Sequence, residues 1–237
     1  MKSIKTYILH YKPLLERKKF LVSKLDSEFI NYEFIEEFDQ EELSLENIKK
    51  DYICSEKSWL YKLEYLEVKG LASFRKLTNA EISLIYKHKK ALELISKSKN
   101  EYELILEDDA IPVARYQKKL KKIFDYDASW DVLFIGLGMG KSFLKKKLKI
   151  RFLVPGLLYK LPGPSTNCTE AILIKPEAAK KILSSFTDFT LPMDFEYAYL
   201  FKRLKLNVKI SSTYIFFQGS KKYNYFKKDI FKTSLDR

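Results

Sequence analysis

The chain has 237 residues, of which 46% are hydrophobic, and 44 Lys and Arg against 31 Asp and Glu give it a formal net charge of +13. A chain of this length can bury one sizeable core, so we expect a single domain. Two cysteines, Cys54 and Cys168, and two histidines, His10 and His88, argue against a disulfide framework, a thiolate metal site and a histidine-rich zinc site.

The positive charge is unevenly spread, because residues 141–237 hold 20 Lys and Arg against 7 Asp and Glu. This asymmetry indicates an anionic partner, which could be nucleic acid, a phosphorylated acceptor or an anionic membrane. A solvated lysine surface explains it equally well.

No apolar run approaches the about 18 residues of a membrane span, and the start of the chain lacks the apolar core of a signal peptide. We therefore expect a cytoplasmic protein.

The first third of the chain predicts two strands and one helix. Residues 4–9 are an apolar run typical of a short buried strand, and Pro13 suits the first turn of a following helix. A second strand is predicted at residues 31–35, followed by an acidic loop or short helix over residues 36–51. Residues 58–68 are too irregular for an assignment.

A helix from residue 79 to about residue 98 is predicted by the spacing of Thr78 and Glu81, which is that of a capping box. The lysines of residues 87–90 are expected to face solvent. By itself, His88 on such a helix indicates a surface or packed histidine rather than a ligand.

Residues 102–112 form an apolar run that ends in three acids, Glu107, Asp108 and Asp109. Successive side chains of a strand point to opposite faces, so Glu107 and Asp109 are expected to share one face and Asp108 to take the other. Neighbouring carboxylates repel unless a cation or hydrogen-bond donors lie between them, and oxygen ligands favour magnesium, manganese or calcium. This pattern predicts a metal-assisted site at the carboxyl end of a strand. Alternatively, Asp108 or Asp109 caps a helix that begins near Pro112.

The second half of the chain alternates strands with helices. Strands are predicted at residues 130–135, 150–154 and 170–174, and a closing strand or pair of strands at 207–217. Helices are predicted at 116–124, 176–183 and 195–204, and a turn-rich loop at 155–164. The segment Gly136-Leu137-Gly138-Met139-Gly140-Lys141-Ser142 is similar to the phosphate loop GxxxxGK[ST], but it is one residue too short, so a glycine-rich turn is favoured. The alternation predicts an α/β fold with a largely parallel sheet.

Several motifs in this order resemble glycosyltransferase family 25, the family of bacterial lipooligosaccharide galactosyltransferases and collagen galactosyltransferases. They are Leu77-Thr78-x-x-Glu81-Ile82 with His88, Ile105-Leu106-Glu107-Asp108-Asp109-Ala110, Trp130-Asp131-Val132-Leu133, Thr169-Glu170-Ala171, Pro192-Met193-Asp194 and Gln218-Gly219-Ser220. The resemblance covers residues 4–220. The chain departs from the family where Ser83, Leu84 and Lys87 replace Gly, Cys and Ser, and where Leu9-His10-Tyr11-Lys12-Pro13 replaces Ile-Asn-Leu-Asp-Arg; Arg17 is retained.

The resemblance implies a GT-A-like nucleotide-sugar-binding fold with a mostly parallel central sheet flanked by helices. It implies one catalytic domain over residues 1–220 and a basic aromatic tail over residues 221–237. The implied activity is a metal-dependent, inverting transfer of a hexose, galactose, from a UDP-linked donor to a saccharide acceptor of lipooligosaccharide or a similar surface glycan. The implied metal is Mn²⁺ or Mg²⁺, held by Asp109 and Glu107.

The resemblance also implies roles for individual residues. Contacts with the nucleotide-sugar donor are expected from Leu9, His10, Tyr11, Arg17, Thr78, Glu81, His88, Glu107, Asp108, Thr169 and Gln218. Asp194 is the expected general base for the acceptor hydroxyl, with Glu196 as the substitute. Because Asp194 follows Pro192 at the start of a predicted helix, it could instead be the N-cap.

The tail alternates Lys221, Lys222, Lys227 and Lys228 with aromatic residues. We expect it to contact an anionic membrane surface, which suits a lipid-linked acceptor, although its aromatic rings could equally pack onto the domain. The same residues could stack on bases in a nucleic-acid-binding module without transferase activity. That alternative leaves the three acids without a role, so nucleic acid is not the expected partner.

Overall fold

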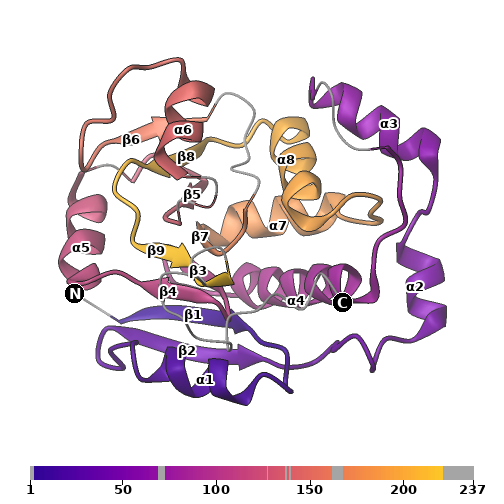
Figure 1. The fold of residues 1–237 in the computed structure, drawn as a ribbon, viewed down its shortest axis with the longest axis horizontal. Helices are drawn as coiled ribbons and strands as arrows, with labels where there is room; N and C mark the ends of the chain where they lie inside the picture. The colour runs from indigo at the N-terminus through magenta and orange to yellow at the C-terminus, as the bar shows by residue number, and fades with distance from the viewer. Residues whose placement is uncertain are drawn as a thin grey trace.

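The computed structural model describes residues 3–68, 73–126, 128–136, 138, 140–161 and 168–220. Its elements are β1 (Ile4–Leu9), α1 (Leu15–Val22), β2 (Ile30–Ile35), α2 (Leu45–Asp51), α3 (Glu56–Tyr65), α4 (Asn79–Ser96), β3 (Glu103–Glu107), β4 (Ala110–Pro112), α5 (Tyr116–Tyr126), β5 (Val132–Phe134), α6 (Gly140–Leu148), β6 (Leu158–Lys160), β7 (Ala171–Ile174), α7 (Pro176–Ser185), α8 (Met193–Arg203), β8 (Val208–Ser211) and β9 (Phe216–Gln218) (Figure 1). The fold is α/β, as the sequence predicts.

The central sheet of the described residues has seven strands in the order β2-β1-β3-β7-β5-β8-β6. Strand β1 pairs in parallel with both β2 and β3, and β5 pairs in parallel with β8. Strand β7 is antiparallel to β3 and β5, and β6 is antiparallel to β8, so five strands point one way and two the other. The prediction of a mostly parallel sheet is therefore confirmed. In this register Leu9 lies beside Glu107, so the carboxyl ends of β1 and β3 meet at one edge.

A separate pair of strands completes that edge. Strand β4 follows the acidic triplet directly and pairs antiparallel with β9, so that Ala110 lies opposite Gln218. This pairing brings the end of the described chain back beside the three acids. The alternative that Asp108 or Asp109 caps a helix near Pro112 is wrong, because Pro112 ends β4 and the next helix, α5, begins at Tyr116.

The sheet is buried on both faces. Helices α4, α7 and α8 cover one face with α3, and helices α1 and α5 cover the other. Residues of β3 alternate between the two cores: Ile105 packs under α4, whereas Leu104 and Leu106 face α1, and all three are fully buried. Each such side chain contributes about 1.5 to 3 kcal/mol of burial free energy. A strand buried on both faces needs a continuous apolar run, and this is why the sequence alone predicts β3.

The structure corrects one further expectation and assigns two segments that the sequence left open. The strand predicted at residues 150–154 is wrong: these residues connect α6 to β6, and their apolar side chains Phe152 and Val154 are 69% and 52% exposed. The unassigned residues 58–68 fall mainly in helix α3. The closing strands β8 and β9 do not pair with each other, because β9 leaves the central sheet to join β4.

Within the described residues, no helix combines the length and the apolar character needed to cross a membrane. The predicted tail at residues 221–237 and part of the predicted loop at residues 155–164 lie outside the described residues.

Candidate active site

A pocket opens where the carboxyl ends of β1 and β3 meet helices α1 and α4. It is lined by Leu9, His10, Tyr11, Leu14, Arg17, Gln40, Ala80, Ser83, Leu84, Lys87, Glu107, Asp108, Asp109, Gln218 and Ser220. Eight of the predicted site residues are brought together here: Leu9, His10, Tyr11, Arg17, Glu107, Asp108, Asp109 and Gln218. The other predicted residues, Thr78, Glu81, His88, Thr169, Asp194 and Glu196, do not line this pocket. Ligands of open α/β sheets bind at this kind of edge.

Glu107 and Asp109 lie close together on one side of the acidic turn. Thr169 Oγ1 donates to Glu107 Oε1 at 2.5 Å, and Ser220 Oγ donates to Asp109 Oδ2 at 2.6 Å. Oδ1 of Asp109 is buried and has no hydrogen-bond partner among the described residues. Burial is the main cause that raises the pKa of both carboxyl groups, and the charge of Asp109 adds to the effect on Glu107, whose pKa rises to about 8. A hydrogen-bond donor or a cation between these two carboxyl groups would offset both the burial and the repulsion that raise their pKa values.

We expect the stability of the metal-free protein to fall as the pH rises between about 4.5 and about 8, because burial raises the pKa of Glu107 to about 8. In that window the folded state keeps a proton that the unfolded chain has already released, so raising the pH favours unfolding. Thermal unfolding in chelator across this range measures the slope. Glu107→Gln should flatten it; an unchanged slope in the variant would assign the pH dependence to other groups.

Asp108 points away from this pair and connects β1 to α1. His10 Nδ1 lies 2.9 Å from Asp108 Oδ2, Arg17 donates to Oδ1 at 2.7 Å, and the Tyr11 amide donates to Oδ2 at 3.3 Å. Burial by itself would raise the pKa of Asp108, but the hydrogen bonds from His10 and Arg17 and the Arg17 charge lower it below its usual value. Asp108 therefore positions His10 and Arg17. It also lines the pocket, so its contact with a donor stays a prediction.

Helix α4 turns one face toward the pocket. Ala80, Ser83, Leu84 and Lys87 line it, at the three- and four-residue spacing of a helical stripe. Three of these four positions are those where the chain departs from the family motif. The sequence could have indicated this face of α4, because Ser83, Leu84 and Lys87, which differ from the family motif, are spaced so that they lie on one side of a helix.

The predicted donor contacts of Thr78 and Glu81 are better explained by local structure. Thr78 accepts from the Glu81 amide and Glu81 accepts from the Thr78 amide, which completes the predicted capping box at the start of α4. Arg75 also donates to both carboxylate oxygens of Glu81. Both side chains therefore stabilise the helix terminus outside the pocket.

Lys87 contradicts the sequence prediction, because it is buried rather than solvent-facing. Its ammonium group donates to the His10 carbonyl at 2.8 Å, the Glu37 carbonyl at 2.8 Å and Asp39 Oδ1 at 2.7 Å. All three donors of the ammonium group are used. Lys87 therefore holds the acidic segment of residues 36–42 against the end of β1.

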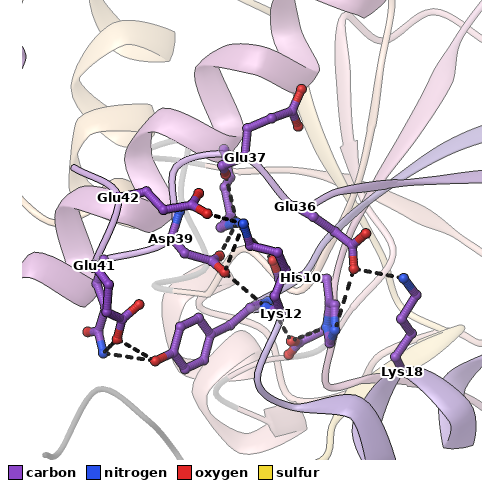
Figure 2. Close-up of polar contacts among 12 residues, drawn as sticks. His10, Lys12, Lys18, Glu36, Glu37, Asp39, Glu41 and Glu42 are labelled. Atoms are coloured by element: carbon purple, nitrogen blue, oxygen red, sulfur yellow. Dashed lines mark hydrogen bonds and ion pairs between the residues drawn. The ribbon is translucent and has the colours of Figure 1, made fainter. Parts of the chain in front are cut away.

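That acidic segment forms one rim of the pocket, and further ion pairs hold it there. Figure 2 shows Glu42 and Asp39 near Lys12, and Glu36 between His10 and Lys18. Lys18 Nζ lies 2.7 Å from Glu36 Oε1. At the outer end, the Tyr11 hydroxyl donates to Glu41 at 2.6 Å and accepts from Gln40, which lines the pocket. Gln40 was not predicted, since nothing in its local sequence distinguishes it.

His88 is a packed histidine, as its position on the helix suggested, and it does not line the pocket. It is fully buried, its Nδ1 lies 3.2 Å from the Tyr197 hydroxyl, and burial lowers its pKa to about 3. The pKa of Tyr197 is raised by burial first and by the charge of Glu107 second. His88 and Tyr197 thus form a neutral layer beneath Glu107.

Glu196 is not placed to act as a base. It is 1% exposed, Lys62 donates to both of its oxygens at 2.8 and 2.9 Å, and the amides of Thr190 and Leu191 donate to Oε1. A buried carboxylate that accepts all of these hydrogen bonds is not free to reach an acceptor. The prediction of Glu196 as a substitute base is therefore wrong, and its role is to join α8 to α3.

Asp194 lies on a different face of α8. It precedes Tyr197 by three residues, so the two share one side of the helix, and Tyr197 is close enough to Glu107 to feel its charge. Asp194 Oδ1 accepts from the Phe195 amide at 3.0 Å. The N-cap position belongs to Pro192, so the N-cap alternative for Asp194 is wrong.

The glycine-rich turn is used for packing within the protein. A Cβ atom on Gly136 would lie 2.3 Å from Glu170 Oε1, and one on Gly138 would lie 2.3 Å from Cys168 Cβ. The Gly138 amide donates to Glu170 at 2.6 Å. This amide meets a carboxylate of the protein, where a phosphate loop would offer it to a nucleotide, so the preference for a simple turn is supported.

The fold and this pocket define an α/β enzyme that binds its ligand at the carboxyl ends of parallel strands. Residues 3–197 match the sequence profile described as glycosyltransferase family 25 (LPS biosynthesis protein), and the chain belongs to this family. It is a glycosyltransferase, which requires a nucleotide-sugar donor and a glycan acceptor. No curated protein matches the sequence.

Three of the solved structures that are similar to the chain come from bacteria. The inositol-1-phosphate CTP transferase of T. maritima has a TM-score of 0.44 and 12% identity, over 92% of this chain and 89% of that chain. TarS of S. aureus has a TM-score of 0.46 and 14% identity, over 95% and 63%. The glycosyltransferase GlyE of Streptococcus pneumoniae TIGR4 has a TM-score of 0.40 and 10% identity, over 100% and 53%. The chain thus spans 63% of the TarS chain and about half of GlyE.

Proposed function

We propose that the protein transfers galactose from a UDP-linked donor to a saccharide acceptor of lipooligosaccharide or a similar surface glycan, with inversion at the anomeric carbon, on a GT-A-like fold. The observation that carries the proposal is the pair of Glu107 and Asp109, which repel each other at the wall of a pocket formed by β1, α1, α4 and β9. The choice of galactose and uridine diphosphate rests on the resemblance to the family.

A divalent cation, Mn²⁺ or Mg²⁺, fits the residues present. Among the described residues, no three His, Cys, Asp or Glu side chains are placed to hold one ion, so the protein offers two carboxylates at most, those of Asp109 and Glu107. Mg²⁺ is often bound by one or two carboxylates together with substrate phosphates. The buried Oδ1 of Asp109, which lacks a partner among the described residues, supports this assignment. When bound, such an ion neutralises charge on the departing diphosphate.

The remaining pocket residues would bind and orient the donor. Leu9, Leu14 and Leu84 offer apolar contact for a nucleobase at the end of the pocket that Gln40 closes. Arg17, held by Asp108, would direct its charge to the diphosphate. Thr169, which donates to Glu107, and Gln218, which lines the pocket, would support the sugar end of the site.

Asp194 would remove the proton from the acceptor hydroxyl as the new glycosidic bond forms. A general base typically contributes about 10² to 10⁴ in rate, so Asp194→Asn is expected to lower kcat by at least about 100-fold. The melting temperature should change little, because the asparagine side-chain oxygen can still accept from the Phe195 amide. Steady-state kinetics and thermal unfolding of the same preparation test this; an unchanged kcat would remove Asp194 from the mechanism.

The test of the whole proposal is turnover of a panel of nucleotide sugars with Mn²⁺, with Mg²⁺ and in chelator. Release of UDP from UDP-galactose, dependent on the cation and on a saccharide acceptor, is the expected result. Turnover of a different nucleotide sugar would overturn the assignment of the donor, and full activity in chelator would overturn the proposed requirement for a divalent cation. Because the proposed acceptor is lipid-linked, we place the reaction at the cytoplasmic face of a membrane.

A further inference from the structure

The positive charge of the protein is concentrated in a folded segment as well as in the tail. Residues 113–160, which comprise α5, β5, α6 and β6 with their connections, contain 12 Lys and Arg against 3 Asp. Residues 221–237 contain 6 against 2. More than half of the net charge of +13 therefore belongs to one stretch of the folded domain.

Side chains from α5, α6 and the connection after α6 surround one surface hollow. Lys119 of α5, Lys141 and Lys145 of α6 and Phe152 line it together with Tyr214. A second hollow, lined by Lys24, Arg115 and neighbouring aromatic residues, shares Tyr214 with the first. Among the described residues that line these two hollows there is no Asp or Glu. The two hollows thus form one continuous cationic surface.

Apolar side chains project from the same surface. Phe152 is 69% exposed and Val154 is 52% exposed, and they are two residues apart in the connection between α6 and β6. The guanidinium carbon of Arg151 lies 5.3 Å from the centre of the Phe152 ring, and Lys141 Nζ lies 5.6 Å from that of Tyr214. Exposed apolar and cationic side chains therefore occur together on this surface, which is an amphipathic arrangement.

We propose that this surface, the α5–α6 face formed by Lys119, Lys141, Lys145, Arg151, Phe152 and Val154, docks onto a bilayer that contains anionic lipid. The lysines complement the negative lipid headgroups, and Phe152 and Val154 enter the interface. Nucleic acid would also attract the lysines, but Val154 offers a base neither a hydrogen bond nor a ring on which to stack. The apolar tips therefore favour a membrane as the partner.

The second hollow, which shares Tyr214 with the hollow of the α5–α6 face, is lined by segments that also line the candidate active site. Arg17 lines the active-site pocket, and Lys24, seven residues later, lines the second hollow. Of the residues of β9, Gln218 lines the active-site pocket and Phe217 lines the second hollow. Figure 1 shows α5, α6 and β6 along the left-hand side of the view, away from α2 and α3. Docking on this face would bring the pocket near the lipid surface. This consequence rests on the proposed function, whereas the docking itself does not.

Cosedimentation of the full chain with phosphatidylcholine vesicles, with and without phosphatidylglycerol, tests the docking without any activity assay. We expect binding to the anionic vesicles alone, weakened by salt. Each lysine near an anionic surface contributes about a fivefold increase in partitioning, so Lys141→Glu with Lys145→Glu should reduce binding by at least about 25-fold. Phe152→Ser should reduce it by about tenfold, because its ring no longer enters the interface.

Matched controls come from the opposite side of the molecule. Leu45 of α2 is 74% exposed, and Lys49 and Lys50 of the same helix are exposed. Leu45→Ser, and Lys49→Glu with Lys50→Glu, should bind vesicles as the unchanged protein does. If a glutamate variant of the α5–α6 face fails to fold by circular dichroism, the glutamine variants of Lys141 and Lys145 replace it.

A variant with Lys221, Lys222, Lys227 and Lys228 changed to Glu separates the tail from the folded face. Loss of binding in the tail variant alone, with the face variants unaffected, would overturn the proposal. Equal binding to neutral vesicles would also overturn it. A third contrary result would be that the protein binds a single-stranded oligonucleotide but no vesicles, and that the variants of the α5–α6 face lose the oligonucleotide binding. This result would identify nucleic acid as the partner.

Discussion

Asp109→Asn is expected to lower the rate of sugar transfer by at least about 10³-fold, the scale on which charge stabilisation at a developing leaving group acts. The variant keeps an oxygen that can accept from the Ser220 amide and hydroxyl, so the contact between β4 and β9 is preserved. It loses the negative charge that, with Glu107, would hold the cation. The melting temperature should be maintained, because removing one of two repelling carboxylates costs the fold nothing.

Asp108→Asn is the informative comparison, because it changes the adjacent carboxylate in a different environment. Asp108 is paired with buried Arg17 and His10, so neutralising it leaves a buried guanidinium without its counter-charge. That variant should lose stability and activity together, whereas Asp109→Asn loses activity alone. Initial rates with and without Mn²⁺, measured beside thermal unfolding, distinguish the two. An Asp109→Asn protein with unchanged turnover and unchanged metal demand would refute the assignment of Asp109.

Lys62→Met is expected to lower the free energy of unfolding by about 3 to 5 kcal/mol, since it removes one member of a buried ion pair. Lys62 and Glu196 are both buried, and the ammonium group contacts both carboxylate oxygens. Without Lys62, Glu196 remains as an uncompensated charge between α3 and α8. For a chain of this size the loss corresponds to a fall in Tm of about 6 to 20 °C.

The double variant Lys62→Met with Glu196→Gln should recover part of this loss. The substituted glutamine is neutral, yet its side-chain oxygen could still accept from the amides of Thr190 and Leu191, as the carboxylate of Glu196 does. Lys202→Met is a matched control, because Lys202 pairs with the exposed Glu67 and its loss should change the Tm little. Thermal unfolding of the four proteins gives the comparison. If Glu196→Gln instead lowered kcat sharply at constant Tm, Glu196 would have to be reconsidered as the base.

Local sequence patterns determined much of this protein. The apolar run of β3 predicts a buried strand, because only a strand covered on both faces needs side chains of that kind at every position. Thr78 and Glu81 predict the start of α4, because a capping box involves only four consecutive residues. Glu107 at the end of β3 and the two acids after it predict a charged site at the carboxyl end of this strand, and the pocket lies there. Each of these inferences depends on residues that are neighbours in the chain.

Only the tertiary structure decided the roles of Lys87, Asp108 and Glu196. Their partners are far away in the chain: Asp39 is 48 residues from Lys87, Arg17 is 91 residues from Asp108, and Lys62 is 134 residues from Glu196. A charged residue on a helix is solvent-facing by default, and it is buried only when another element supplies a counter-charge or hydrogen bonds. The same reason explains why the sequence did not predict Gln40 in the pocket, since its partner Tyr11 is 29 residues away. Periodicity predicts which face of an element is buried in a core, whereas the pairing of distant polar groups depends on the packing of whole elements.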